Sequence, residues 1–183
     1  QILFANDPGS PDHPSWSPDS TKIAFASRAN SSLFKKDIKV ANKDGSELIQ
    51  LTSGTGENIT PAWSPDGTKI AFASDRDGNW EIYVMKSDGN EQNRLTYDPG
   101  DDNAPIWSPD GTKIAFTSTR EPAPSIKQYT DIYVMSSDGG YATRLTGDPL
   151  GPKQNIWIDN VLTELPIGGK NAAWSPDGSK IVF

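Results

Sequence analysis

The sequence predicts an all-β fold, a β-propeller of four-stranded antiparallel blades, from a repeated motif, the strand-forming runs behind it and the turns between them. The motif Trp-Ser-Pro-Asp begins at Trp16, Trp63, Trp107 and Trp174, and its first three copies start 47 and 44 residues apart. The runs that follow are rich in β-branched and aromatic residues, which favour strands. Asp-Gly dipeptides between the runs favour tight hairpin turns. Repeats of this length with four short strands are typical of propeller blades.

Each complete unit contains four predicted strands, which are clearest in the second copy. The first strand ends at Trp63, and a Pro-Asp-Gly turn leads into the second strand at 69–74. Proline suits this turn because its φ is fixed, and glycine suits it because it accepts a positive φ. The third strand, 81–86, ends at an Asp-Gly turn, and the fourth, 92–96, ends in Leu-Thr. The same order recurs in the first and third copies.

The repeat divides the chain into the parts of a single propeller domain or of a fragment of one. Complete units are expected at 14–52, 60–96 and 104–146. A last unit starts at 171–183, and residues 1–5 are expected to supply the fourth strand of a closing blade.

Residues 148–163 break the pattern. Trp157 stands where a first strand belongs and Leu162-Thr163 where a fourth strand ends, with no room for the two strands between them. An internal deletion that leaves a two-strand remnant explains this, and so do residues near 158–160 that a parent chain contains and this sequence lacks. We favour the second explanation, because a first and a fourth strand do not normally pair without the strands between them.

Three complete units are too few for the usual ring of four to eight blades. An open array exposes strand edges and apolar blade faces, which promotes aggregation. We therefore expect the chain to be a fragment, to have further residues, or to close its ring with a second copy as a homo-oligomer.

Composition argues against several classes of function. The net charge is −7, from 24 acidic and 17 basic residues, whereas nucleic-acid binding needs a concentrated basic face. The absence of cysteine excludes disulfides, cysteine-bound zinc and thiol catalysis. No apolar run approaches the roughly 20 residues that span a bilayer, and a signal peptide is expected to be absent or already removed.

Catalytic and metal-binding motifs are poorly represented. His13 is the only histidine, which argues against a histidine metal cage and a Ser-His-Asp triad. Gly-x-Ser-x-Gly does not occur. The segment 75–86 has the alternating oxygen donors of a calcium loop, but its glycine is fourth rather than sixth and Lys86 replaces the final glutamate. We interpret it as a hairpin turn and expect no enzyme activity and no cofactor beyond a weakly bound divalent cation such as calcium.

One face of the predicted propeller is expected to be acidic. The loops that join successive units share this face with the loops between second and third strands. Like charges held close together are unfavourable unless a cation or a basic partner neutralises them. We predict that a divalent cation or a basic peptide binds there, at Asp7, Asp12, His13, Asp75, Asp77, Asp98, Asp101, Asp102 and Asn103.

The tryptophans of the repeat are expected to be structural. Large aromatic side chains fill space between neighbouring blades. Trp63 and Trp107 should therefore be largely buried, and the same structural role is assigned to Trp16, Trp157 and Trp174.

The repeat resembles that of the TolB-like β-propeller family, which also occurs in the propeller domains of the prolyl oligopeptidase and tricorn protease families. The matching residues are Trp-Ser-Pro-Asp-Gly-x-Lys-Ile-Ala-Phe, then Asp/Glu-Ile-Tyr-Val-Met, an Asp-Gly turn and Arg-Leu-Thr. The resemblance implies a periplasmic or secreted scaffold that binds a protein, such as a Pal-like lipoprotein. Alternatives are the substrate-gating propeller domain of a prolyl-oligopeptidase-like peptidase and a propeller lyase, for which a single histidine is a poor match.

Overall fold

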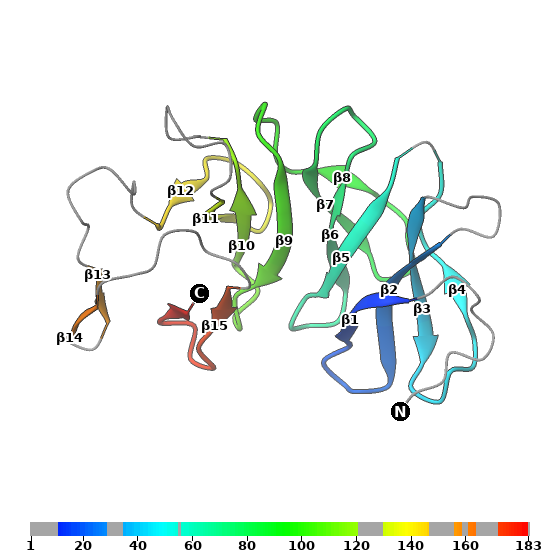
Figure 1. Cartoon of the computed structure of the whole chain (residues 1–183). Helices are drawn as coiled ribbons and strands as arrows, with labels where there is room; N and C mark the ends of the chain where they lie inside the picture. The colour runs from blue at the N-terminus through cyan, green and yellow to red at the C-terminus, as the bar shows by residue number, and fades with distance from the viewer. Residues whose placement is uncertain are drawn as a thin grey trace.

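The described part of the protein consists of strands and turns (Figure 1). A computed structural model describes residues 11–28, 35–54, 56–120, 130–146, 156–158, 161–163 and 172–182. These residues form three four-stranded and two two-stranded antiparallel sheets, and none of them is helical. It follows that no helix in these ranges is long and apolar enough to cross a membrane. The predicted all-β propeller fold is confirmed.

The three four-stranded sheets are called blades 1, 2 and 3 below. Blade 1 contains β1 (Asp12–Trp16), β2 (Lys22–Arg28), β3 (Lys36–Asn42) and β4 (Ile49–Gln50). Blade 2 contains β5 (Asn58–Trp63), β6 (Lys69–Ser74), β7 (Glu81–Lys86) and β8 (Asn93–Arg94). Blade 3 contains β9 (Asp102–Trp107), β10 (Lys113–Ser118), β11 (Asp131–Ser136) and β12 (Thr143–Arg144). In each blade the strands pair in the order of the sequence, as a meander.

The two-stranded sheets come from the irregular and last parts of the repeat. Strand β13 (Ile156–Ile158) pairs with β14 (Val161–Thr163), so the first and fourth strands of the irregular unit pair directly, contrary to the expectation above. Strand β15 (Ala173–Trp174) pairs with β16 (Ile181–Val182). Residues 159–160, and the fourth strand expected at 1–5, lie outside the described residues.

The core lies between the blades and follows from strand alternation. In β6, Ile70 and Phe72 point to one side of the sheet, and Ala71 and Ala73 point to the other. The large side chains pack on the alanine face of blade 1, and the alanine face of blade 2 receives the equivalent large side chains of blade 3. Because Phe72 is fully buried, replacing it by alanine should cost about 3–5 kcal/mol.

The tryptophans are less buried than the sequence predicts. Trp63 and Trp107 each pack against an inter-blade cluster but are only partly buried, and Trp16 is 49% exposed. Each ends the first strand of its blade, so part of the indole faces away from the core. Trp174 is also partly buried, and the side chain of Trp157 lies outside the described residues.

A bulge recurs in the first strand of every complete blade. His13, Thr60 and Ala104, each three residues before the tryptophan, have φ values of 50, 51 and 51°. The pairing register shifts at the same place in all three blades. Bulges of this kind bend a strand and increase its twist. The strand that begins each blade is thus bent in the same way three times.

Candidate functional site

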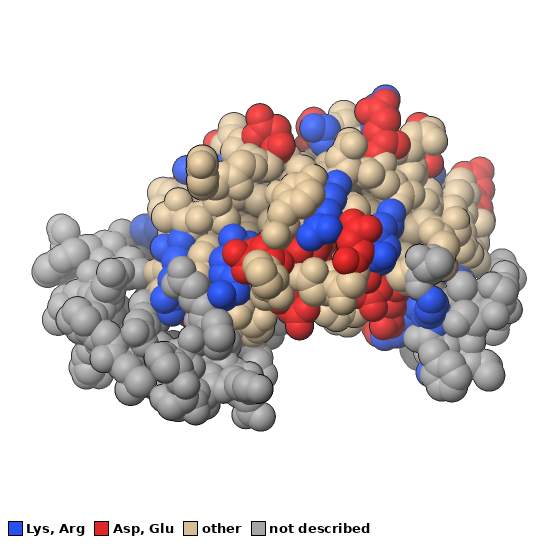
Figure 2. Space-filling view, turned by 90° about the horizontal axis from the view of Figure 1, so that it is seen from above, with Lys and Arg blue, Asp and Glu red and all other residues tan. Residues whose placement is uncertain are grey.

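The candidate site is the face predicted to be acidic, called the loop face below. It is formed by the loops that join one blade to the next, such as 97–101, and by the loops between second and third strands, such as 75–80. It is the upper side of the molecule in Figure 1. Figure 2 shows this side with basic and acidic side chains next to each other across its middle. The face therefore has mixed charge rather than a purely acidic rim.

Three of the predicted acids bind backbone N–H groups of the loops. The Oδ1 atom of Asp75 accepts from the backbone N of Glu57 at 2.6 Å, and that of Asp101 accepts from the N of Trp80 at 3.1 Å. Asp98 accepts from the N of Gly100 at 3.1 Å within its own loop. These backbone donors relieve part of the repulsion between the carboxylates. That repulsion is the reason for predicting a bound cation or basic peptide. The ligand itself stays a prediction.

Asp77 takes part in a network with blade 2. Its Oδ2 atom accepts from the hydroxyl of Tyr83 and from a guanidinium nitrogen of Arg94, the latter at 3.3 Å. The hydrogen bond from Tyr83, with a smaller contribution from Arg94, lowers the pKa of Asp77. This carboxylate is therefore ionised and held in place.

Asp102 was predicted to lie on the rim, and this is wrong. Its side chain is 0% exposed, at the start of β9 between blades 2 and 3, and its Oδ2 atom accepts from Arg120 at 2.6 Å. Burial raises its pKa to about 6, against the opposing effects of Ser118 and Arg120. Asn103, the next residue, is partly buried, and its backbone carbonyl accepts from the hydroxyl of Thr117.

The predicted residues of blade 1 form a separate group. Asp12 accepts from Lys36 Nζ at 2.5 Å, and the carboxylate lies 3.0 Å from Nδ1 of His13. Despite opposing desolvation, the bonds from Lys36 and His13 lower the pKa of Asp12. Asp7 lies outside the described residues. Within the described ranges, no three histidine or carboxylate side chains gather closely enough to hold a metal ion.

Sequence reasoning missed a network around Arg94. The buried carboxylate of Glu81 accepts from Arg94 at 2.6 Å and from Thr96 Oγ1 at 2.5 Å. The Arg94 guanidinium lies 4.6 Å from the ring centre of Tyr97, whose hydroxyl donates to the Arg94 carbonyl at 3.1 Å. Tyr97 is nevertheless 72% exposed. An exposed aromatic ring on the loop face is thus held by the Arg94 guanidinium and by a hydrogen bond to the Arg94 backbone carbonyl.

A signal for this network was present in the repeat. Arg-Leu-Thr recurs in blade 3, where Arg144 donates to Asp131 at 2.8 Å. In blade 1 the arginine position is Gln50, and the tyrosine position is Ser53. Because blade 1 has Ser53 at the position equivalent to Tyr97, the repeat does not require a large aromatic residue there.

Two further arginines anchor the loops of blades 2 and 3. Arg76 lies over the rings of Phe72 and Tyr83, and Arg120 lies over the equivalent pair in blade 3. A side chain at Gly100 would place Cβ 2.4 Å from the Cα atom of Arg120. Glycine is therefore required where this loop passes the arginine.

Comparison with known proteins places these features in a family. A family model described as the TolB beta propeller domain matches residues 10–182. None of the curated proteins matches the chain.

Solved structures with the same fold include TolB proteins and an enzyme. A protein described as a TolB from Agrobacterium tumefaciens is 28% identical, with a TM-score of 0.66, and the alignment covers 77% of this chain and 50% of that one. TolB from Acinetobacter baumannii is 22% identical, with a TM-score of 0.68 and coverage of 96% and 37%. An oligogalacturonate lyase in complex with manganese is 17% identical, with a TM-score of 0.60 and coverage of 96% and 44%. The chain thus spans half or less of the length of these proteins.

Proposed function

Because the chain belongs to the TolB β-propeller domain family, we propose that it is a non-catalytic scaffold that binds a protein partner through its loop face. TolB homologues are periplasmic, so the proposed location is the periplasm or the cell exterior. The fold is also found in an enzyme, so the proposal depends on the surface of this chain rather than on its architecture.

The observation that carries the proposal is the fixed, exposed ring of Tyr97. Tyrosine and arginine are enriched among the residues that contribute most to protein interfaces. The Tyr97 ring is 72% exposed but is already held by Arg94, which is itself paired with Glu81. Binding therefore has to order few side chains, and this lowers its entropic cost.

The partner we propose to test first is a Pal-like lipoprotein, which the family resemblance implies. The mixed charges of the loop face would steer such a partner and orient it, while the tyrosine supplies contact area (Figure 2).

The experiment compares two exposed tyrosines. Tyr97→Ser introduces the residue that blade 1 has at this place, so the loop should keep its conformation. We expect it to weaken binding of a purified Pal-like lipoprotein, measured by titration calorimetry, by about thirty-fold, as loss of an interface hot spot does. Tyr141→Ser is the matched control, because Tyr141 is fully exposed but lies between β11 and β12, away from the loop face.

Equal losses in the two variants would contradict the loop face as the contact surface. Tight binding that neither variant alters would do the same.

A further inference from the structure

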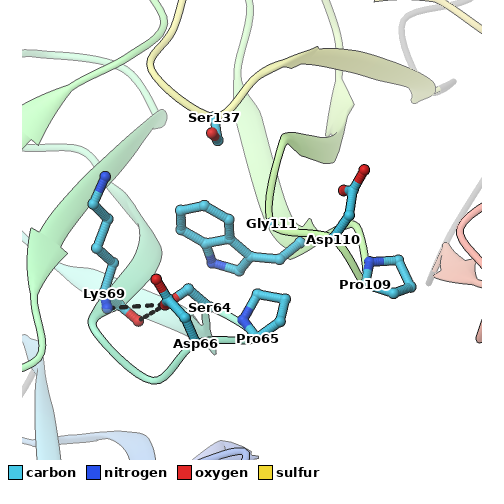
Figure 3. Close-up of a pocket in the computed structure, with 9 residues that line it drawn as sticks. Ser64, Pro65, Asp66, Lys69, Pro109, Asp110, Gly111 and Ser137 are labelled. Carbon is cyan, nitrogen blue, oxygen red and sulfur yellow. Dashed lines mark hydrogen bonds between the residues drawn. The ribbon is translucent and has the colours of Figure 1, made fainter.

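A second surface, on the side opposite the loop face, contains a hollow between blades 2 and 3. Its volume is about 340 Å³, and the Pro-Asp-Gly turns of both blades line it. Figure 3 shows Asp66 and Lys69 of blade 2 on one side of the hollow and Asp110 of blade 3 on the other. Trp107 also lines the hollow. The hollow thus combines an aromatic wall with charged groups from two blades.

The two carboxylates of the hollow are held rigidly by their own turns. Asp66 Oδ1 accepts from Ser64 Oγ at 2.6 Å and from the backbone N of Thr68 at 3.0 Å. Asp110 has the same two bonds in the turn of blade 3. The serine hydroxyl is the main cause that lowers the pKa of both groups, to about 2 for Asp110. Both are therefore negatively charged near neutral pH.

We propose that this hollow binds an arginine side chain of a partner protein, with the guanidinium stacked on Trp107 and directed toward Asp66 and Asp110. Tryptophan is the best aromatic partner for a cation, and the planar guanidinium both stacks on rings and donates pairs of hydrogen bonds to carboxylates. Two carboxylates and one ammonium group line the hollow, so its net charge is negative. A chain of net charge −7 adds to this preference for a cation.

The proposal predicts that Lys69 affects arginine binding in the direction opposite to Asp66 and Asp110. It lines the hollow, and among the described residues it is not one of the groups that lower the pKa of Asp66 or Asp110. Its ammonium group therefore repels a bound guanidinium without being needed to hold the two turns. Removing this charge should strengthen binding, whereas removing a carboxylate should weaken it.

The experiment follows the indole Nε1–H of Trp107 by NMR while Nα-acetyl-arginine amide is added. This N–H donates to the Ala62 carbonyl at 3.0 Å and so reports from the wall of the hollow; Trp107→Phe identifies its signal. Nα-acetyl-citrulline amide, which has nearly the same shape but no charge, is the ligand control. We expect a saturable shift with the arginine compound and none with the citrulline compound.

Variants then distinguish the role of the aspartates in binding arginine from their role in holding the turns. Asp66→Asn and Asp110→Asn should each weaken binding roughly two- to five-fold, and Lys69→Gln should tighten it by a similar factor, as expected for exposed ion pairs. Asp19→Asn is the matched control, because Asp19 accepts the same bonds from Ser17 and Thr21 in blade 1 but does not line the hollow. Its affinity should be unchanged.

Three results would overturn the proposal: equal shifts with citrulline, equal losses in the Asp19 and Asp66 variants, or no saturable shift. The site does not depend on the proposed function, because Tyr97→Ser alters the loop face and should leave arginine binding unchanged. Failure at one face is therefore distinguishable from failure at the other.

Discussion

The junction between blades 1 and 2 and the junction between blades 2 and 3 have the same apolar core but different charges. Asp37, the second residue of the third strand of blade 1, accepts hydrogen bonds from Asn58 and Gln50, and Arg76 donates to Asn58. At the equivalent places the second junction has Glu81, Arg120, Asp102 and Arg94. Asp102 thus stands where the first junction has the amide of Asn58, and Arg94 stands where it has the amide of Gln50.

The two replacements compensate each other. Among these four positions, the first junction has one negative and one positive charge, and the second has two of each. Burying an unpaired charge costs several kcal/mol, whereas a hydrogen-bonded pair is tolerated. The junction between blades 2 and 3 can therefore hold the additional carboxylate of Asp102, because Arg94 adds a positive charge where blade 1 has Gln50.

The largest expected effect comes from removing the arginine at each junction. Arg120→Met leaves the buried Asp102 unpaired and should cost about 3–5 kcal/mol of unfolding free energy at pH 8. Arg76→Met loses an equivalent stacking position, but the hydrogen-bond partners of Arg76 are the neutral side chains of Asn58, Gln92 and Ser74, so the cost should be about 1–2 kcal/mol. Urea denaturation of both variants measures the difference. Equal losses would show that the charge of Asp102 does not distinguish the junctions.

A smaller effect is expected from pH. The pKa of Asp102 rises from 3.8 to about 6 on folding, so the folded state holds its proton more tightly. The stability contributed by this group is present below about pH 4 and is lost as pH rises through about 6. Asp102→Asn, which copies Asn58, should remove about 2 kcal/mol of this pH dependence.

Denaturation midpoints between pH 4 and 8 check this prediction. Ile114→Val serves as the control, because Ile114 is a fully buried apolar side chain of the same junction and its truncation should shift every midpoint without changing their slope against pH. A slope that persists in Asp102→Asn would assign the pH dependence to another group.

The smallest effect concerns the turns that join the first and second strands of the blades. Ser20 has a φ of 57° at the place where blades 2 and 3 have Gly67 and Gly111, with φ values of 70 and 71°. A left-handed conformation costs a non-glycine residue about 1–2 kcal/mol. Ser20→Gly should therefore raise the unfolding free energy by about 1 kcal/mol, and Gly67→Ser should lower it by a similar amount. Thermal denaturation in which Ser20→Gly is destabilising would contradict this account.

Local patterns in the sequence predict the strands well and the loop face poorly. The runs at 69–74 and 81–86 coincide with β6 and β7, because alternation and turn residues are properties of short segments. Asp98, Asp101 and Asp102 look alike in one acidic loop, yet only Asp102 is buried, because the strand of blade 3 begins there rather than at 104. Its burial depends on contact with blade 2, which no local pattern contains.

The network around Tyr97 was hidden for the same reason. Arg94 is visible in Arg-Leu-Thr, but its partner Glu81 lies on the neighbouring strand, 13 residues away in the sequence. Tyr97 is not part of the repeated motif, and a search for repeats finds the residues that the units share rather than those in which they differ. Comparing equivalent positions between units would have identified it.

The alternation of alanine and large faces also bears on how such a chain can evolve. Blades 2 and 3 each present Ile, Phe, Tyr and Met on one side, and blades 1 and 2 each receive these side chains on a face of alanines, Ile and Val, so neighbours stack in one direction only. A duplicated gene segment of one repeat, inserted between two others, would encode a blade that fits both neighbours without changes to either. Growth by duplication is then limited by the curvature of the array, and new specificity can arise at single loop positions such as Tyr97 while the stack is copied unchanged.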